Sequence, residues 1–222
     1  MVSRETPGPT PPLPDWLATQ AGPLTAFADL LADAGVTRGL IGPREVPRLW
    51  ARHILNCAVV AEPSAGLVPT GATIGDVGSG AGLPGLVWAI ARPDTTVVLI
   101  EPLLRRSTFL SEAVAELGLG DRVTVWRGRA EDAASQPGFS PLAVVTARAV
   151  APLERLVGWT VPLLAAGGRL VALKGSSAAQ ELADGHAVAV AAGLTELEVR
   201  EVGAGVVDPP TTVIIGVRRT AQ

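Results

Sequence analysis

The sequence of 222 residues contains one cysteine, no tyrosine, three phenylalanines and two histidines. The lone Cys57 excludes a disulfide within the chain. The lack of tyrosine and the small number of phenylalanines argue against an aromatic platform on which nucleic-acid bases stack. No apolar run approaches the ~20 residues of a membrane span, and the start lacks the apolar core of a signal peptide. We therefore expect a cytoplasmic protein with no membrane partner.

Lysine is also nearly absent, because Lys174 is the only one and the other basic residues are arginines. The formal net charge is −3, which excludes a polycation that binds nucleic acid through its overall field. A nucleic-acid partner would need a local basic surface. Arg44, Arg48 and Arg52 provide one in a helix predicted from about 44 to 60, because a spacing of four residues puts them on one face. That face is either a contact for the RNA backbone or solvated surface.

His53 and Cys57 also lie four residues apart in this helix. Two ligands do not make a zinc site, so we expect both side chains to pack and predict no metal.

What the sequence has in abundance is glycine, above all in residues 75–85, Gly-Asp-Val-Gly-Ser-Gly-Ala-Gly-Leu-Pro-Gly. An apolar run (72–74) precedes this stretch and a helix-compatible run (86–91) follows it, so a strand, a turn and a helix are predicted. Gly78, Gly80 and Gly82 allow positive φ and a close approach of backbone to ligand. The first amides of the helix then face whatever binds there.

Two ligand classes compete for this loop. Gly80-x-Gly82-x-x-Gly85, with Glu101 further on, matches the dinucleotide fingerprint and suggests an NAD(P)-dependent oxidoreductase. Asp76 favours S-adenosylmethionine (SAM), whose sulfonium and amino groups suit a carboxylate that would repel a pyrophosphate. The lack of tyrosine removes the Tyr/Lys pair that an oxidoreductase would need. A non-catalytic regulator that binds SAM or RNA is a third possibility.

The rest of the chain predicts an α/β fold of the SAM-dependent methyltransferase (Rossmann-like) type, with a mostly parallel sheet and a terminal antiparallel hairpin. We divide it into a disordered Pro-rich tail (1–14), an N-terminal helical extension (15–66) and the main domain (67–222). Strands are expected at 96–100, 122–126, 142–146, 169–173, 195–202 and 212–217. The helices include one from Pro102, with Leu103 on its buried side, and one over 152–166 that Gly167 and Gly168 close.

Several polar residues follow the predicted strands, at the carboxyl edge where ligands of such sheets bind. Glu101 ends the second strand, ~20 residues beyond the glycines, where an acid can accept hydrogen bonds from ribose hydroxyls. Residues 127–132 follow the third strand, Arg148 the fourth and Lys174 the fifth.

Four segments together resemble the RsmG (GidB) family of ribosomal RNA methyltransferases. They are the glycine stretch 75–85, Arg52-His53-Ile54-Leu55, Arg148-Ala149 and Ala172-Leu173-Lys174-Gly175. The resemblance extends from about residue 15 to residue 217. It implies methylation of N7 of a guanosine in the decoding-site loop of bacterial 16S ribosomal RNA, with SAM as methyl donor. The implied partner is 16S rRNA, the small ribosomal subunit or an assembly intermediate of it, and we expect a monomer.

The resemblance, the chemistry of the glycine loop and strand ends, and the helical spacing of the arginines together predict roles for single residues. Arg148 and Lys174 would position the reactants; no general base is expected, because guanine N7 already carries a free lone pair. The SAM contacts would include the glycine loop and the strand ends: Asp76, Gly78, Gly80, Gly82, Leu83, Glu101, Ala130, Glu131 and Arg148. The RNA contacts would be Arg44, Arg48, Arg52, His53 and Lys174.

Overall fold

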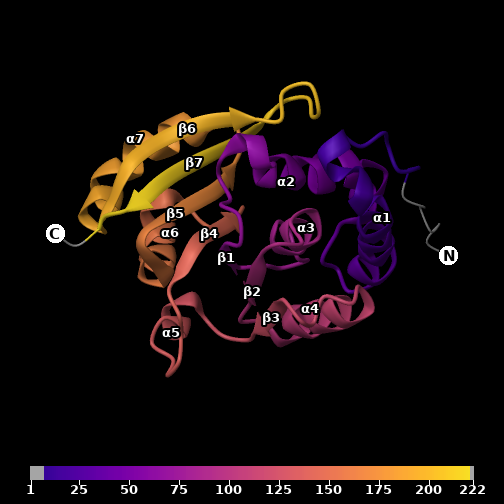
Figure 1. The fold of residues 1–222 in the computed structure, drawn as a ribbon, viewed down its shortest axis with the longest axis horizontal. Helices are drawn as coiled ribbons and strands as arrows, with labels where there is room; N and C mark the ends of the chain where they lie inside the picture. Colours follow the sequence, from indigo (N-terminus) through magenta and orange to yellow (C-terminus); the bar gives the residue numbers. More distant parts are fainter. Residues whose placement is uncertain (1–7, 221–222) are drawn as a thin grey trace.

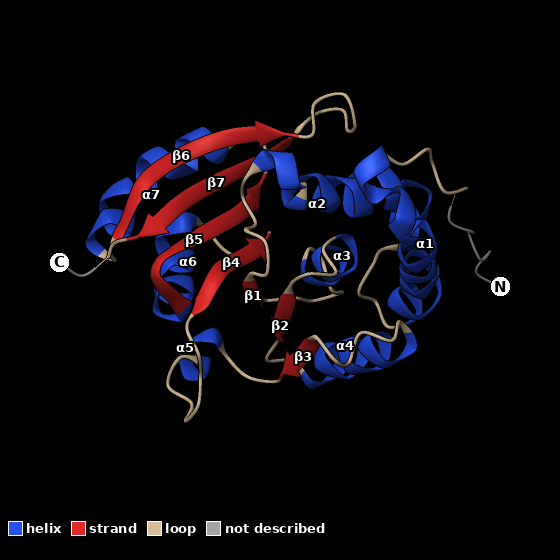
Figure 2. Cartoon of the chain, viewed as in Figure 1, coloured by secondary structure: helices blue, strands red, loops and turns tan. Residues whose placement is uncertain are grey.

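The computed structural model describes residues 8–220 and contains one seven-stranded sheet in the order β3-β2-β1-β4-β5-β7-β6 (Figures 1 and 2). Its strands are β1 (Thr73–Val77), β2 (Thr96–Ile100), β3 (Val123–Trp126), β4 (Leu142–Arg148), β5 (Leu164–Lys174), β6 (Leu194–Val202) and β7 (Thr211–Arg218). β1 to β5 are parallel, and β7 runs antiparallel to both β5 and β6. The predicted mixed sheet with a terminal antiparallel hairpin is confirmed.

Helices cover both faces of this sheet. The α-helices are α1 (Ala21–Leu30), α2 (Asn56–Ala58), α3 (Gly85–Ala91), α4 (Leu104–Glu116), α5 (Ala130–Ala133), α6 (Leu153–Thr160) and α7 (Ala178–Ala191). In Figure 1, α1 to α4 lie on one side of the sheet and α5 to α7 on the other. Side chains alternate along a strand, so Val171 and Leu173 of β5 enter the first core while Leu170 and Ala172 enter the second.

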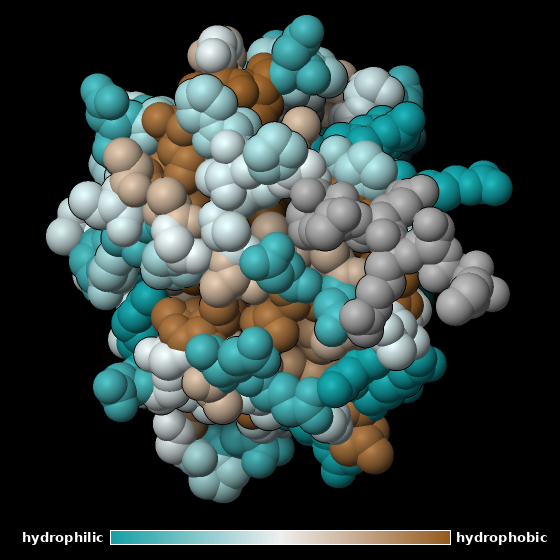
Figure 3. Space-filling model, turned by 90° about the vertical axis from the view of Figure 1, so that its right-hand side faces the viewer, coloured by the Kyte–Doolittle hydropathy of each residue, from teal (hydrophilic) through white to brown (hydrophobic). Residues whose placement is uncertain are grey.

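The N-terminal extension shares the first of these cores. Leu17, Leu24 and Phe27 are fully buried in the same cluster as Trp88 of α3. The Trp88 indole Nε1 donates to the carbonyl of Cys57 at 2.9 Å. The extension is therefore packed onto the sheet domain rather than tethered to it. On the face of the molecule that carries the extension, polar side chains surround several smaller apolar areas (Figure 3).

Residues 8–14 of the predicted tail form no helix or strand, and residues 1–7 lie outside the described part. No helix within 8–220 is long and apolar enough to cross a bilayer.

Three predicted elements differ from the structure by more than two residues. β1 continues through Asp76 to Val77, so the glycine turn begins three residues later than expected. Gly167 and Gly168 lie inside β5 instead of closing a helix, because α6 ends at Thr160 and a 3-10 turn, η7 (Val161–Leu163), leads directly into the strand.

The third difference concerns the predicted helix over 44–60, which is a succession of short helical types. It consists of the 3-10 helix η3 (Pro43–Arg48), the π-helix η4 (Leu49–Leu55), α2 and the 3-10 helix η5 (Val59–Ala61). Pro47 has no N–H to donate inside an α-helix. The prediction that Arg44, Arg48 and Arg52 share one helical face assumed a continuous α-helix, and this segment is not one.

Candidate functional site

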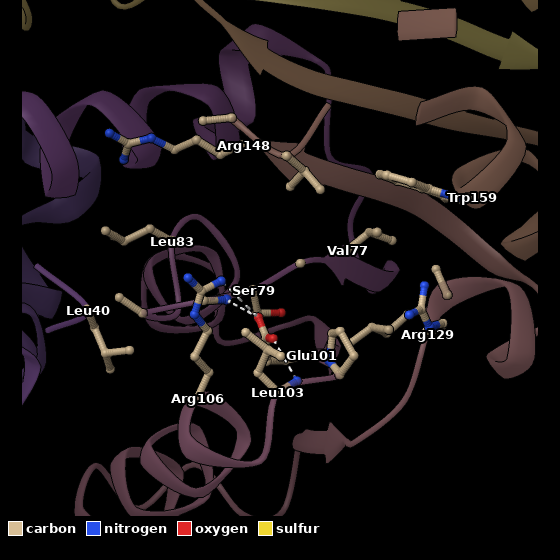
Figure 4. A pocket seen from close by; sticks show the side chains of 18 of the residues that line it. Leu40, Val77, Ser79, Leu83, Glu101, Leu103, Arg106, Arg129, Arg148 and Trp159 are labelled. Atoms are coloured by element: carbon tan, nitrogen blue, oxygen red, sulfur yellow. Dashed lines mark hydrogen bonds and ion pairs between the residues drawn. The ribbon is translucent and has the colours of Figure 1, made fainter. Parts of the chain in front are cut away.

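A cavity of about 630 Å³ opens at the carboxyl edge of the parallel strands. Residues from the ends of β1, β2 and β4 and from the loop after β3 line it, among them Gly78, Gly80, Glu101, Ala130 and Arg148. The sequence predicted that these residues meet at one edge, and the fold brings them together. Figure 4 shows Glu101 and Arg106 on one side of the cavity and Arg148 on the other.

The glycine loop supplies backbone to this cavity. Gly78, Gly80 and Gly82 all have positive φ, at 71°, 55° and 88°. A Cβ on Gly82 would come within 2.5 Å of the Leu86 side chain, whereas one on Gly80 would meet nothing closer than 3.7 Å. Gly82 does not line the cavity, so its glycine serves packing of the loop on α3; Gly80 is open toward the cavity.

Glu101 is the acidic group of the site, and its side chain is only 2 % exposed. One carboxylate oxygen accepts from the backbone N–H of Gly80 at 3.0 Å and the other from that of Leu103 at 3.0 Å. Arg106 adds an ion pair at 3.9 Å. Each oxygen retains a lone pair, so the carboxylate is held in place and can still accept from a ligand.

Asp76 was predicted to contact the ligand, but it lies in the interior of β1, paired with Leu99 of β2 and Thr146 of β4. It is fully buried and does not line the cavity. Its Oδ2 accepts from the N–H of Gly85 at 3.0 Å, whereas Oδ1 has no partner within the described residues. Burial raises the pKa of this carboxyl group to about 7. The position gives Asp76 a structural role at the start of α3.

Arg148 ends β4 and reaches the N-terminal extension. Its guanidinium donates to the Cys57 Sγ at 3.1 Å, the Arg52 carbonyl at 3.1 Å and the His53 Nδ1 at 2.8 Å. The His53 Nε2 contacts Glu45 Oε2 at 2.9 Å. These contacts use three of the five guanidinium N–H groups, and the remaining two are available where Arg148 lines the cavity.

Several side chains predicted for RNA have other surroundings. His53 has both ring nitrogens engaged within the protein, and burial together with the charge of Arg148 lowers its pKa. Lys174 is 7 % exposed, donates to the Ala151 carbonyl at 2.8 Å and forms an ion pair with Glu181. Neither is free to bind a phosphate at the surface. Arg44, Arg48 and Arg52 are exposed, as an RNA contact requires.

The remaining predicted residues, Leu83 and Glu131, line the cavity as expected. Sequence reasoning missed further lining residues, among them Leu40, Arg106 and Trp159. It also placed Leu103 on the buried side of its helix; α4 begins one residue later, and Leu103 is 54 % exposed at the cavity. Trp159 comes from the second half of α6, and no local pattern marks it.

Solved structures with the same fold define the class of the protein. The S-adenosylmethionine-dependent methyltransferase SibL aligns with a TM-score of 0.60 at 16 % identity, covering 92 % of this chain and 70 % of that one. A predicted O-methyltransferase from Agrobacterium tumefaciens aligns with a TM-score of 0.56 at 17 % identity, covering 76 % and 83 %. The fold is that of the class I methyltransferases.

The family follows from closer sequence matches. Residues 20–208 match the family described as rRNA small subunit methyltransferase G (GidB). The ribosomal RNA small subunit methyltransferase G of Salinispora tropica is 60 % identical over 192 residues, which cover 85 % of this chain and 78 % of the relative. That of Mycolicibacterium gilvum is 52 % identical over 215 residues, covering 95 % and 92 %. The chain belongs to the rRNA small subunit methyltransferase G family and is a methyltransferase of small-subunit rRNA, which excludes the oxidoreductase and the non-catalytic regulator.

Proposed function

We propose that the chain transfers the methyl group of SAM to N7 of a guanosine in the decoding-site loop of 16S rRNA. The observation that carries the donor assignment is Glu101. It is an acid fixed by two backbone amides at the end of β2, directly beside the open Gly80 of the loop after β1. Such an acid suits the two hydroxyls of a ribose. The apolar Ile100 and Ala130 line the same cavity and suit the face of an adenine ring.

SAM supplies an electrophilic methyl group on a sulfonium sulfur. In the reaction the N7 lone pair forms the new N–C bond while the C–S bond breaks, and the positive charge passes from the sulfur to the purine. No proton has to be removed from N7, so the residues of the chain act by orienting the two reactants. Glu101 and the Gly78–Gly80 backbone hold the donor, and Arg148, fixed by the extension, forms the opposite wall of the cavity.

The substrate is 16S rRNA, the small ribosomal subunit or an assembly intermediate of it, the protein acts as a monomer, and its place of action is the cytoplasm. Incubation of small subunits lacking this modification with labelled SAM, followed by chemical cleavage at 7-methylguanosine, tests the reaction. We expect one labelled position, in the decoding-site loop. Label at another position or on another atom would overturn the assignment.

Gly80→Ala tests the donor site, with Gly118→Ala as matched control. Both glycines have positive φ, and an added Cβ would make no close contact at either, so each variant should lose a similar ~1–2 kcal/mol of stability. Of the two, Gly80 alone lines the cavity. We expect SAM affinity in calorimetry to fall at least about tenfold, or 1.4 kcal/mol, in Gly80→Ala and to remain unchanged in Gly118→Ala. Equal affinities would place SAM elsewhere.

A further inference from the structure

A second cavity, of about 510 Å³, lies beside the first and shares with it the wall formed by Arg148, Ala149 and Val150. Ala149 has φ of 53°, a left-handed conformation that non-glycine residues seldom adopt and that clusters at functional sites. The chain bends here, directly after β4, so the two cavities adjoin at this turn. Ligands in the two cavities would lie next to each other there.

Three distant segments build the second cavity. Asn56 comes from α2 of the extension, Lys174 from the end of β5 and Glu181 from α7. The Thr211 hydroxyl donates to the Asn56 carbonyl at 2.9 Å, which fixes the extension to β7. Lys174 ties the other two walls together, because it donates to the Ala151 carbonyl and pairs with Glu181. The cavity is thus held by specific contacts.

Polar groups without a partner in the described chain remain on its walls. Lys174 pairs with Oε1 of Glu181, which leaves Oε2 as an acceptor. The Asn56 side-chain amide has no hydrogen bond within residues 8–220, and two guanidinium N–H groups of Arg148 are also available. The cavity therefore offers several donors and one carboxylate oxygen, between the apolar side chains of Leu173 and Pro152.

We propose that this second cavity is the subsite for the guanine base, an inference that rests on the proposed N7 methylation. Guanine presents N1–H and the 2-amino group as donors on one edge, which suits the Glu181 carboxylate. The neighbouring O6 accepts from Arg148 or Asn56, and N7, next to O6, is directed past Ala149 into the first cavity, where it contacts the methyl donor. Adenine has a lone pair at N1, so Glu181 would repel it. Glu181 thereby determines which purine is bound.

Replacement of the target guanosine by inosine tests this, because inosine lacks only the 2-amino group. In the wild type, kcat/KM for methyl transfer should be at least about tenfold lower for the inosine substrate, since the Glu181 carboxylate, whose side chain is only 20 % exposed, loses a donor. In Glu181→Gln this ratio should shrink to about twofold or less, because the neutral amide accepts more weakly. A wild type that methylates both substrates equally, or a Glu181→Gln variant that keeps the wild-type ratio, overturns the subsite.

Two further variants separate recognition from structure. Lys174→Met breaks the same ion pair but retains the carboxylate, so its overall rate should fall while the guanosine-to-inosine ratio stays at the wild-type value. The double variant Lys174→Met/Glu181→Gln leaves no unpaired buried charge, and it must lose the discrimination even if Glu181→Gln alone fails to fold. A wild type that methylates no guanosine at N7, while it binds SAM, would instead overturn the proposed function.

Discussion

Asp76 illustrates at the scale of a single residue how position changes the role of a group. It precedes the glycine loop as a ligand-binding acid would, yet the pairing of β1 with β2 and β4 buries it completely. Loss of hydration disfavours the charged form, and this raises its pKa from an ordinary 3.8 to about 7. Within the described chain Oδ1 has no partner, which agrees with a carboxyl group that retains its proton.

Asp76→Asn should make the protein less sensitive to alkaline pH. The folded pKa lies above the unfolded one, so the stabilisation by proton uptake is complete below pH 3.8 and is lost as pH rises through about 7. The asparagine variant should therefore gain stability relative to the wild type between about pH 5 and about pH 8.5, by roughly 3 kcal/mol. Urea unfolding at the two pH values measures it. A difference that does not change with pH, or a large loss of SAM affinity in the variant, would contradict the structural role.

At the scale of elements, the segment 43–61 acts as the support of Arg148. Its irregular succession of helical turns brings the Arg52 carbonyl, His53 and Cys57 to one guanidinium. Glu45 accepts from the His53 Nε2–H, which leaves the Nδ1 lone pair directed at Arg148. The spacing of these residues in the sequence does not predict their contacts with Arg148, because the contacts depend on where β4 ends relative to the extension.

His53→Asn keeps an acceptor near the Nδ1 position but cannot take up a proton. Burial and the charge of Arg148 lower the pKa of His53 from its ordinary 6.5. As pH falls below 6.5, the unfolded chain therefore takes up a proton at this residue before the folded chain does, and the folded state loses stability. Between about pH 6.5 and about pH 5.5 the wild type should lose up to about 1 kcal/mol more than the variant, because one pKa unit corresponds to about 1.36 kcal/mol. Thermal or urea unfolding at both pH values gives the comparison.

His53→Leu serves as the control, because it removes the acceptor altogether. Its methyl-transfer rate should be low at both pH values, while His53→Asn should retain most of the rate. A similar rate in the leucine and asparagine variants would show that the Arg148 contact does not matter for the reaction.

At the scale of the whole molecule, the extension and the sheet domain form one packed body. Arg92, at the end of α3, donates to the carbonyls of Ala61, Val68 and Pro69, and one core runs through both parts. The exposed arginines of the extension are therefore held at a fixed position relative to both cavities. We propose that this local arginine surface, and not the overall charge of the protein, contacts the RNA.

Arg44→Ala and Arg48→Ala should each weaken rRNA binding and reduce its dependence on salt. Removal of one phosphate contact should lower the log–log slope of affinity against salt by ~0.7–0.9, with SAM affinity unchanged. Arg219→Ala is the control, since Arg219 is exposed just beyond the end of β7, away from both cavities. The test is rRNA affinity measured across a salt series. If both the Arg44 and the Arg48 variant keep the wild-type slope, these arginines do not contact RNA and are only solvated surface.

The order of elements, the glycine turn and the acid after β2 could all be predicted from the amino-acid sequence. These features are local: apolar periodicity, glycine and the length of each run specify strands and helices, and parallel strands place their ends at one edge. The meeting of Glu101, Ala130 and Arg148 at the first cavity was predictable for this reason. The motif order was also sufficient to indicate the family that the relatives confirm.

Only the tertiary structure decided what each of these side chains contacts. It buried Asp76, paired Lys174 with Glu181, engaged both nitrogens of His53 and brought Asn56 of the extension against β4, β5 and α7. Residues 56, 148 and 181 are far apart in the chain, so their distances depend on sheet register and on the packing of the extension. Local sequence patterns carry no information on such distances, which is why the second cavity emerges only from the folded chain.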